Sequence, residues 1–311
     1  MTDGMVRIPA GTFRMGSDAH YPEEAPPHDV TVDGFWIDRG PVTNRQFAQF
    51  VRDIGYVTVA ERPLDPADFP GAPPENLVPG SLVFTMTPGP VDLRHINQWW
   101  TWTPGASWSS PDGPSSSISG REDEPVVHVA YEDAEMYAAW AGKTLPTEAQ
   151  WEWAARGGLE AAAFVWGDSP EGPGERLANY WHGEFPWRPD HGYGARLPVG
   201  SFAPNGYGLY DMAGNTWDWT SDWYSPRRLH KQGTEEFCVP ANPRGGRVED
   251  SYDPAQPQFR IPRKVIKGGS YLCADSYCLR YRPAARRPQM IDTGMSHIGF
   301  RCTRIDQPAE A

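Results

Sequence analysis

Two cysteines near the carboxyl end of the chain lie in a stretch whose side chains suit redox or metal chemistry. Cys273 and Cys278 are five residues apart within residues 267–282, and they are two of only four cysteines in the 311 residues. Their spacing places them off a common face of a helix and on opposite faces of a strand, so the sulfur atoms can meet only where the backbone bends. Three outcomes are open: a disulfide, a metal site, or two unrelated buried thiols.

The surroundings of this pair favour reactivity over a purely structural bridge. A disulfide would close a very short loop, which gains the least chain entropy. Two thiolates are too few for a closed tetrahedral zinc site, and soft sulfur in a two-ligand set suits Cu(I) best. Because free buried cysteine is common, two structural cysteines remain an open alternative. Nearby cations lower a cysteine pKa and favour the thiolate. They are Lys267, Arg280, Arg282, Arg286 and Arg287.

Composition predicts a rigid, loop-rich architecture. The chain has 33 prolines, 32 glycines and 14 tryptophans, which indicates scarce regular secondary structure and aromatic side chains that fill irregular spaces. No flexible linker divides the chain. We therefore expect residues 1–311 to form a single domain, with a flexible tail over the last few residues.

Charge and hydropathy argue against two classes of partner. The 40 acidic and 28 basic residues give a net charge of −12, which disfavours nucleic acid because phosphates call for a basic surface. The chain shows no run of about 18 apolar residues and no basic-plus-apolar leader, so neither a membrane span nor a signal peptide is expected. We therefore expect a cytoplasmic protein, in which thiols stay reduced.

Three helices are predicted from local signals. Thr-x-x-Gln capping boxes start helices at Thr43 and at Thr147, and Gly55 ends the first of them. Residues 134–141 form a second helix by their apolar spacing, and residues 157–158 end the third.

An amino-terminal pairing of antiparallel strands is expected between residues 6–15 and residues 30–37, which have β-branched and aromatic character. On the third helix, Glu148 and Glu152 have the spacing of ordinary solvated or helix-dipole carboxylates. No catalytic role is assigned to these two carboxylates.

One segment alternates carboxylates with small residues and can wrap a hard cation. Asp211, Gly214, Thr216 and Asp218 offer carboxylate and backbone carbonyl oxygens, a donor set that suits calcium better than magnesium. The spacing is not that of an EF-hand. The residues alone therefore also allow aspartates that merely cap turns.

The chain resembles the formylglycine-generating enzymes of the bacterial aerobic type, also called sulfatase-modifying factors, over nearly its whole length. The likeness includes a carboxy-terminal signature, in which the cysteine pair is the specific part. The signature consists of Gly268-Gly269-Ser270-Tyr271, Cys273, Cys278-Leu279-Arg280-Tyr281-Arg282, Ala284-Ala285-Arg286 and Ile298-Gly299-Phe300-Arg301-Cys302. The resemblance implies an α+β fold, a single irregular, loop-rich domain of the formylglycine-generating-enzyme and C-type-lectin-like kind.

The resemblance implies a copper-dependent oxidase. Such an enzyme converts a cysteine in a Cys-x-Pro-x-Arg motif of an unfolded sulfatase into Cα-formylglycine, with molecular oxygen and an external thiol reductant. By resemblance, Cys273 and Cys278 hold Cu(I) in near-linear geometry, and the substrate thiolate joins as a third sulfur ligand. Ser270 matches a family residue that orients oxygen or the thiolate. Trp217 matches one that excludes water, although core packing is an equally good reading of a tryptophan.

The resemblance also implies two structural calcium ions, which tie together loops without sheet or helix hydrogen bonds. The ligands matched to the first ion are Asp211, the carbonyls of Gly214 and Thr216, and Asp218. The ligands matched to the second ion are Asn179 and Tyr180, with Asp190 and Tyr193 as a later carboxylate and carbonyl.

Two other function classes stay open. Iron-dependent sulfoxide synthases share the fold, but iron sites show clustered histidine and carboxylate ligands, and none of the eight histidines here has another three or four residues away. A non-enzymatic C-type-lectin-like binding module would have no need of the cysteine pair at 273 and 278.

Two positions depart from the family pattern. Cys302 matches half of a disulfide found in secreted members, so Cys302 and Cys238 are expected to be reduced or paired with each other. His297 stands where some members have an asparagine near the substrate groove.

Overall fold

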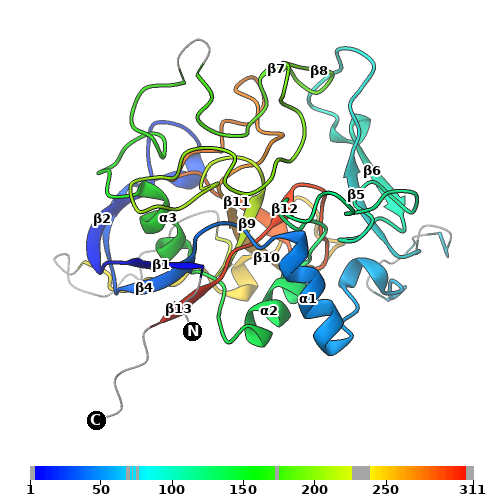
Figure 1. Ribbon diagram of the computed structural model, residues 1–311, viewed down its shortest axis with the longest axis horizontal. Helices are drawn as coiled ribbons and strands as arrows, with labels where there is room; N and C mark the ends of the chain where they lie inside the picture. The colour runs from blue at the N-terminus through cyan, green and yellow to red at the C-terminus, as the bar shows by residue number, and fades with distance from the viewer. Residues whose placement is uncertain are drawn as a thin grey trace.

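The computed structural model describes residues 4–67, 71, 73, 74, 77–171, 175–225 and 239–305. Within these residues the chain forms three α-helices and many short strands, joined by long loops (Figure 1). The predicted tail and Cys238 lie outside the described residues. No helix in the described part of the chain is long and apolar enough to cross a membrane.

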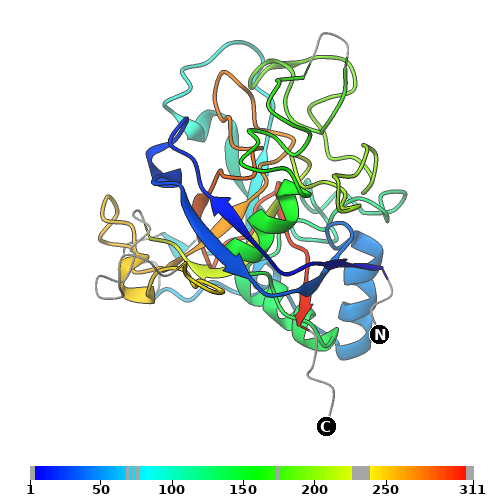
Figure 2. The ribbon, with the colours of Figure 1, turned by 90° about the vertical axis from the view of Figure 1, so that its left-hand side faces the viewer.

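The amino-terminal strands pair as the sequence predicts. Strand β2 (Gly11–Met15) pairs antiparallel with β3 (His28–Val32), and β1 (Met5–Ile8) pairs antiparallel with β4 (Phe35–Asp38). Strand β13 (Thr303–Ile305) pairs with the other edge of β4, so the last described strand lies in one sheet with the first (Figure 2). Hairpin-like pairs also join β5 (Gly80–Phe84) to β6 (Trp100–Pro104) and β7 (Gly183–Glu184) to β8 (Arg188–Pro189).

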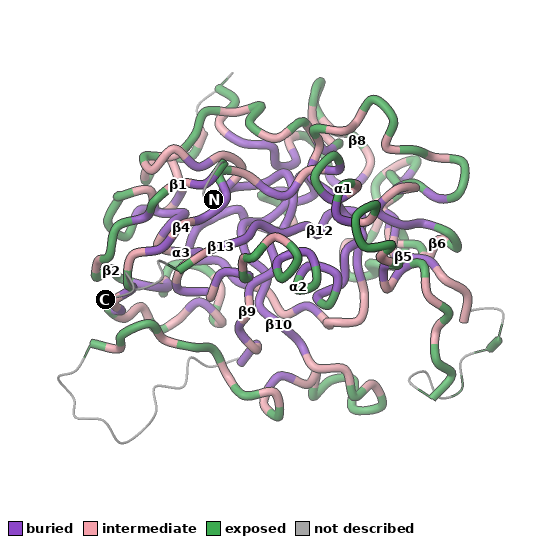
Figure 3. The backbone as a smooth tube through the Cα atoms, turned by 60° about the horizontal axis from the view of Figure 1, so that its bottom comes forward, coloured by how far each residue is buried: buried purple, intermediate pink, exposed green. Residues whose placement is uncertain are grey.

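A four-stranded sheet carries the loops of chemical interest. Its order is β11 (Arg287–Met290), β10 (Arg263–Lys267), β9 (Trp217–Trp223) and β12 (Ile298–Gly299). The central strands β9 and β10 run through the buried interior (Figure 3). The segment with alternating carboxylates leads into β9, and the cysteine-bearing segment joins β10 to β11. One sheet therefore positions both segments.

The helices begin and end where local chemistry predicts. Helix α1 (Asn44–Ile54) starts with a reciprocal capping box between Thr43 and Gln46 and ends at Gly55, whose φ of 64° is left-handed. Helix α3 (Glu148–Arg156) starts at Thr147 in the same way and ends at residue 157. Helix α2 (Tyr131–Trp140) starts a few residues earlier than predicted, because the Asp133 carboxylate caps the backbone N–H of residue 130.

Short 3₁₀ turns interrupt the loops. Those described are η1 (Pro22–Glu24), η2 (Val59–Glu61), η4 (Ile96–Gln98) and η5 (Val248–Asp250). Aromatic side chains fill the space between loops, as composition predicts. In one such group, the Phe185 ring stacks on Tyr277 at 4.8 Å and meets Trp99 edge-on at 5.6 Å.

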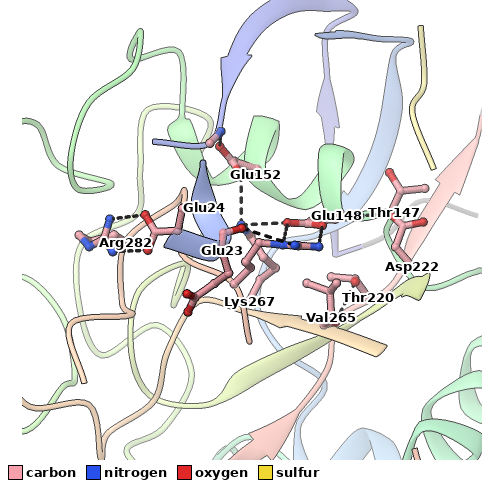
Figure 4. A network of polar contacts seen from close by, with 12 residues as sticks. Glu23, Glu24, Thr147, Glu148, Glu152, Thr220, Asp222, Val265, Lys267 and Arg282 are labelled. Atoms are coloured by element: carbon pink, nitrogen blue, oxygen red, sulfur yellow. Dashed lines mark hydrogen bonds and ion pairs between the residues drawn. The ribbon is translucent and has the colours of Figure 1, made fainter. Parts of the chain in front are cut away.

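Helix α3 carries buried charge, which contradicts the expectation of solvated carboxylates. The side chains of Glu148 and Glu152 are buried because they face β10 and the amino-terminal strands instead of water. Glu152 bonds to Lys267 at 3.1 Å, and Glu148 forms two bonds of 2.9 Å to Arg286 (Figure 4). Lys267 and Arg286 lie more than one hundred residues away in the chain, beyond the reach of a spacing argument. Arg156, which donates to Glu152 at 2.7 Å, lies one helical turn away.

Candidate active site and calcium loops

The two cysteine sulfurs meet in a buried turn between β10 and β11. The Sγ atoms of Cys273 and Cys278 are 3.2 Å apart, and both thiols are free and buried. A tight turn creates this proximity, because the Cys278 N–H donates to the Ala274 carbonyl at 2.6 Å and the Cys273 N–H donates to the Ser270 carbonyl at 2.9 Å. The turn therefore supplies the backbone bend that the spacing requires.

Glycine makes the close approach at the start of this loop possible. Gly269 has a φ of +71°, and a Cβ there would lie 2.8 Å from the Tyr281 Cα. The Tyr281 hydroxyl donates to Asp275 Oδ1 at 2.5 Å, which ties the far end of the loop back to its middle. The segment holding both cysteines is thus closed upon itself.

Ser270 lies beside the Cys273 sulfur, and Trp217 lies in the large apolar cluster that contains both cysteines. The Ser270 backbone N–H donates to Cys273 Sγ at 3.4 Å, and its side chain is fully buried. The backbone N–H of Trp217 donates to the carbonyl of His297 at 2.9 Å. Both positions allow the roles that the resemblance implies, while the burial of Trp217 is equally that of a core residue.

The two thiols have opposite electrostatic environments. Burial raises the pKa of Cys273. A hydrogen bond from Cys273, together with the nearby Arg287 and Arg280 guanidinium groups, lowers the pKa of Cys278. The pair therefore favours one thiol that donates to one thiolate, a combination suited to soft-metal binding or thiol exchange.

Only some of the cations predicted to act on the cysteines do so. Arg280 and Arg287 act on Cys278. Arg282 forms two hydrogen bonds to the Glu24 carboxylate instead, and the other two cations, at 286 and 267, bond to the helix α3 carboxylates. Sequence reasoning missed this division because each carboxylate partner is remote in the chain.

The first set of predicted calcium ligands forms a turn that leads into β9. Gly214 has a φ of +74°, and a Cβ there would lie 2.2 Å from the Asn179 carbonyl oxygen. The Asp211 carboxylate accepts from the Gly200 N–H at 2.8 Å. Asp218 Oδ2 accepts from the Arg301 side chain at 2.6 Å, but the buried Asp218 Oδ1 has no hydrogen-bond partner within the described ranges of the chain.

Two further buried oxygens near this turn are also unsatisfied: Thr216 Oγ1 and Asn179 Oδ1. Asn179 forms an isolated β-bridge with Gly214, and its Nδ2 donates to Asn215 Oδ1 at 3.1 Å. The two predicted ligand sets are therefore in direct contact. Buried oxygens without donors are costly unless a cation or water satisfies them. The donor set fits a hard cation.

The rest of the second set is less well gathered. The Asp190 N–H donates to the carbonyl of His182 at 2.8 Å, and the Tyr193 ring stacks on the His182 ring at 3.9 Å. Tyr180 also contacts His182, with ring centroids 4.1 Å apart. Among the described residues, no hydrogen bond links Asp190 or Tyr193 to Asn179, and no group of three or more histidine, cysteine, aspartate or glutamate side chains is placed to hold a metal ion.

Comparison with known proteins identifies the family. The sequence model of one protein family, the sulfatase-modifying factor enzyme 1-like domain, matches residues 1–305. The chain belongs to this family. It is 51% identical over 304 residues to the formylglycine-generating enzyme of Mycobacterium tuberculosis, a match that covers 97% of this chain and 98% of that protein. The enzyme of the same name from Thermomonospora curvata is 45% identical, with 96% of this chain and 92% of that protein covered.

Relatives named as enzymes confirm an enzyme of the formylglycine-generating kind. PvdO from Pseudomonas aeruginosa confirms the loop-rich α+β fold, with a TM-score of 0.65 at 23% identity over 97% of this chain and 94% of that one. A Mus musculus relative named inactive Cα-formylglycine-generating enzyme 2 is 40% identical, with 96% of this chain and 84% of that protein covered. Identity alone therefore does not fix the chemistry, and the site residues must be tested.

Proposed function

We propose that this chain oxidises a cysteine of an unfolded sulfatase, within a Cys-x-Pro-x-Arg motif, to Cα-formylglycine, using copper, dioxygen and a thiol reductant. One observation supports this most strongly: the free, buried sulfurs of Cys273 and Cys278 lie 3.2 Å apart. Family members named formylglycine-generating enzyme supply the substrate class.

The donor chemistry of the dithiol fits Cu(I). Two soft sulfurs lie side by side, and they suit a soft monovalent ion. Arg280 and Arg287 offset the negative charge that two thiolates and a substrate thiolate would bring into a buried space. When bound, the copper ion supplies the redox chemistry that lets dioxygen react with a thiol.

The protein residues do the rest. Cys273 and Cys278 hold the ion, and the Ser270 N–H fixes the orientation of the Cys273 sulfur. Trp217 keeps the pocket apolar and excludes water from the reacting sulfur. The overall reaction balances when the substrate CH₂–SH group and O₂ take up two electrons and two protons to give an aldehyde, hydrogen sulfide and water. Two molecules of thiol reductant supply those electrons and protons and leave as a disulfide.

Two structural calcium ions complete the proposal. Asp211, the carbonyls of Gly214 and Thr216, and Asp218 are the proposed ligands of one ion. Support comes from Asp218 Oδ1, which has no hydrogen-bond partner among the described residues, while the unsatisfied oxygen of Thr216 is its hydroxyl and not its carbonyl. The proposed ligands of the other are Asn179, Tyr180, Asp190 and Tyr193. For this second set, support comes from Asn179 Oδ1 alone.

The deciding experiment measures aldehyde formation. Copper-loaded protein is incubated in air with a thiol reductant and a Leu-Cys-Thr-Pro-Ser-Arg peptide, and the peptide mass is followed. We expect the mass loss of thiol-to-aldehyde conversion, and its absence in Cys273→Ser. Cys302→Ser is the matched control, because Cys302 is also a buried free thiol but lies beside Asp38.

A binding module is the second candidate function. It is favoured if Cys273→Ser keeps full activity toward a sulfatase peptide, or if wild-type protein binds the peptide but never converts it. An iron-dependent oxidation is favoured if ferrous iron, and not copper, supports a mass change.

A further inference from the structure

A short segment near the amino terminus grips the loop that follows Cys278. We define this strap as Tyr21 together with the η1 turn, Pro22–Glu24. It lies 257 or 258 residues away in sequence from the loop residues that it contacts. Glu24 and its partner Arg282 are visible in Figure 4, with Glu23 beside them.

The strap contacts the residues directly after Cys278. The Leu279 backbone N–H donates to the Tyr21 hydroxyl at 3.0 Å. The next residue, Arg280, places its guanidinium carbon 3.7 Å from the centre of the Tyr21 ring and donates to Glu23 Oε1 at 2.6 Å. A cation held between a ring face and a carboxylate has little freedom left.

A second pair anchors the strap itself. Glu24 and Arg282 are 0% and 1% exposed, and the two groups are joined by two hydrogen bonds. The Glu23 carbonyl also accepts from Arg286 at 3.5 Å. The buried pair fixes the strap in the core, and the half-buried pair of Glu23 with Arg280 reaches toward the site.

Arg280 follows Cys278 by two residues and keeps unused donor capacity. Its buried Nε–H has no hydrogen-bond partner among the described residues. Its positive charge is one of the influences that lower the pKa of Cys278. Packing alone gives no reason to hold a guanidinium rigidly, two residues after a cysteine of the buried dithiol, while one of its donors stays unpaired.

We propose that the strap is a positioning element of the active site, in which Tyr21 and Glu23 hold Arg280 against the Cys278 sulfur. The inference rests on the proposed function, because the charge that Arg280 offsets is that of a thiolate centre holding copper and a substrate thiolate. Tyr21 and Glu23 touch neither copper nor substrate and act only through Arg280.

Glu23→Gln tests the proposal. We expect the affinity for Cu(I), measured by competition with a chromophoric chelator, to fall about tenfold, the lower end of the effect of a charge-assisted hydrogen bond. We expect kcat for the peptide to fall by a similar factor and KM to change less than about twofold. Glu23→Asp, which keeps the charge, restores most of both losses.

A second Tyr, Arg and Glu trio provides the matched control. Arg62 lies 5.4 Å from the Tyr56 ring centre and pairs with Glu132 at 2.7 Å, beside helices α1 and α2. Glu132→Gln removes the same kind of carboxylate and is expected to change neither copper affinity nor kcat. The proposal is overturned if Glu23→Gln also leaves both unchanged, or if it lowers the melting temperature as much as Glu24→Gln does, since the strap would then only pack.

A metal-free measurement separates this proposal from the proposed function. In Tyr21→Phe, which lacks the hydroxyl acceptor, we expect the Leu279 amide to exchange its hydrogen about tenfold faster than in wild type. If wild type makes no aldehyde but the Leu279 amide loses protection in Tyr21→Phe, the proposed function fails while the positioning role stands. If exchange is unchanged in Tyr21→Phe, the positioning role fails whatever the activity.

Discussion

The dithiol loop between β10 and β11 and the oxygen-ligand turn before β9 are held in place by different interactions. Both lack regular hydrogen bonding, and they touch, because the Gly214 N–H donates to the Gly268 carbonyl at 2.8 Å. The dithiol loop is closed by the protein's own charges, with Arg282 on Glu24 and Arg286 on Glu148.

The oxygen-ligand turn is not closed in this way. Its cation from the chain, Arg301, satisfies only one oxygen of Asp218, and buried side-chain oxygens of Thr216 and Asn179 have no partner in the described part of the chain. Ion pairs within the protein thus hold the dithiol loop. Under the proposed function, an added calcium ion contacts the oxygens of the other turn that the chain leaves without donors.

The largest expected effect is on the sulfur side. Cys278→Ser should lower kcat/KM for the peptide at least about 1,000-fold, because a serine hydroxyl is a poor ligand for a soft ion. The melting temperature should barely change, since the arginine pairs and not the thiol hold the loop. Activity assays together with thermal melts check this. A large loss of stability in Cys278→Ser would break the comparison.

Next in size is the loss of a buried carboxylate. Glu24→Gln leaves Arg282 buried and unpaired, which should lower the free energy of unfolding by about 3–5 kcal/mol. Denaturant titration measures the change. The double variant Glu24→Leu with Arg282→Met removes both charges and should recover most of the loss. Equal instability of the single and double variants would contradict the assignment.

Calcium removal should have a smaller effect, confined to the oxygen-ligand turn. An ion present at 100 times its Kd contributes about 2.7 kcal/mol. For a chain of 311 residues, that corresponds to a melting temperature roughly 4 °C lower after treatment with EGTA. The same shift should occur in Cys278→Ser, because the two loops are held independently. Identical melting curves with and without EGTA would show that no ion completes the turn.

The smallest expected effect is on the pH dependence of stability and concerns the buried His128. Its hydrogen-bond partners are neutral, unlike those of the buried ion pairs. His128 bonds to Ser81 Oγ and to the Pro111 carbonyl, each at 2.8 Å. Burial, with a contribution from Arg196, lowers the pKa of His128 to about 3. Between pH 6.5 and 3 the unfolded chain therefore binds the proton more tightly, so stability is lost as pH falls through this window.

At pH 5 the loss due to His128 is roughly 2 kcal/mol relative to neutral pH. His128→Gln should flatten this acid limb in a series of denaturant titrations, whatever its effect at pH 7. His95→Gln, which alters an exposed side chain, should keep the limb. An unchanged limb in His128→Gln would assign the acid sensitivity to other groups.

The sequence predicts helix ends, which depend on neighbouring residues, but it does not predict ion pairs between remote residues. The start of α1 at Thr43 and its end at Gly55 depend on neighbours within four residues, so the pattern predicts them. The spacing of Cys273 and Cys278 shows that the sulfurs need a bend, but the bend itself depends on Gly269 passing close to Tyr281. The sequence alone does not reveal that contact.

The buried carboxylates show the limit most clearly. Glu148 and Glu152 have the spacing of exposed helix residues. Arg156 is a local partner of Glu152, but the other partners, Arg286 and Lys267, lie more than one hundred positions away. The strap likewise has no signal in one sequence, because Glu23 and Arg280 are 257 positions apart. A charged side chain is buried together with its partner, and a single sequence does not reveal which remote residues are partners.

The distance in sequence between the strap and its arginines has a consequence for biosynthesis. Glu24 leaves the ribosome 258 residues before Arg282, so the nascent chain carries an acidic group whose counter-charge does not yet exist. The buried pair therefore forms only after Arg282 has been made. Chains truncated before Arg282 would lack the pair, and we expect them to be unfolded substrates for proteases.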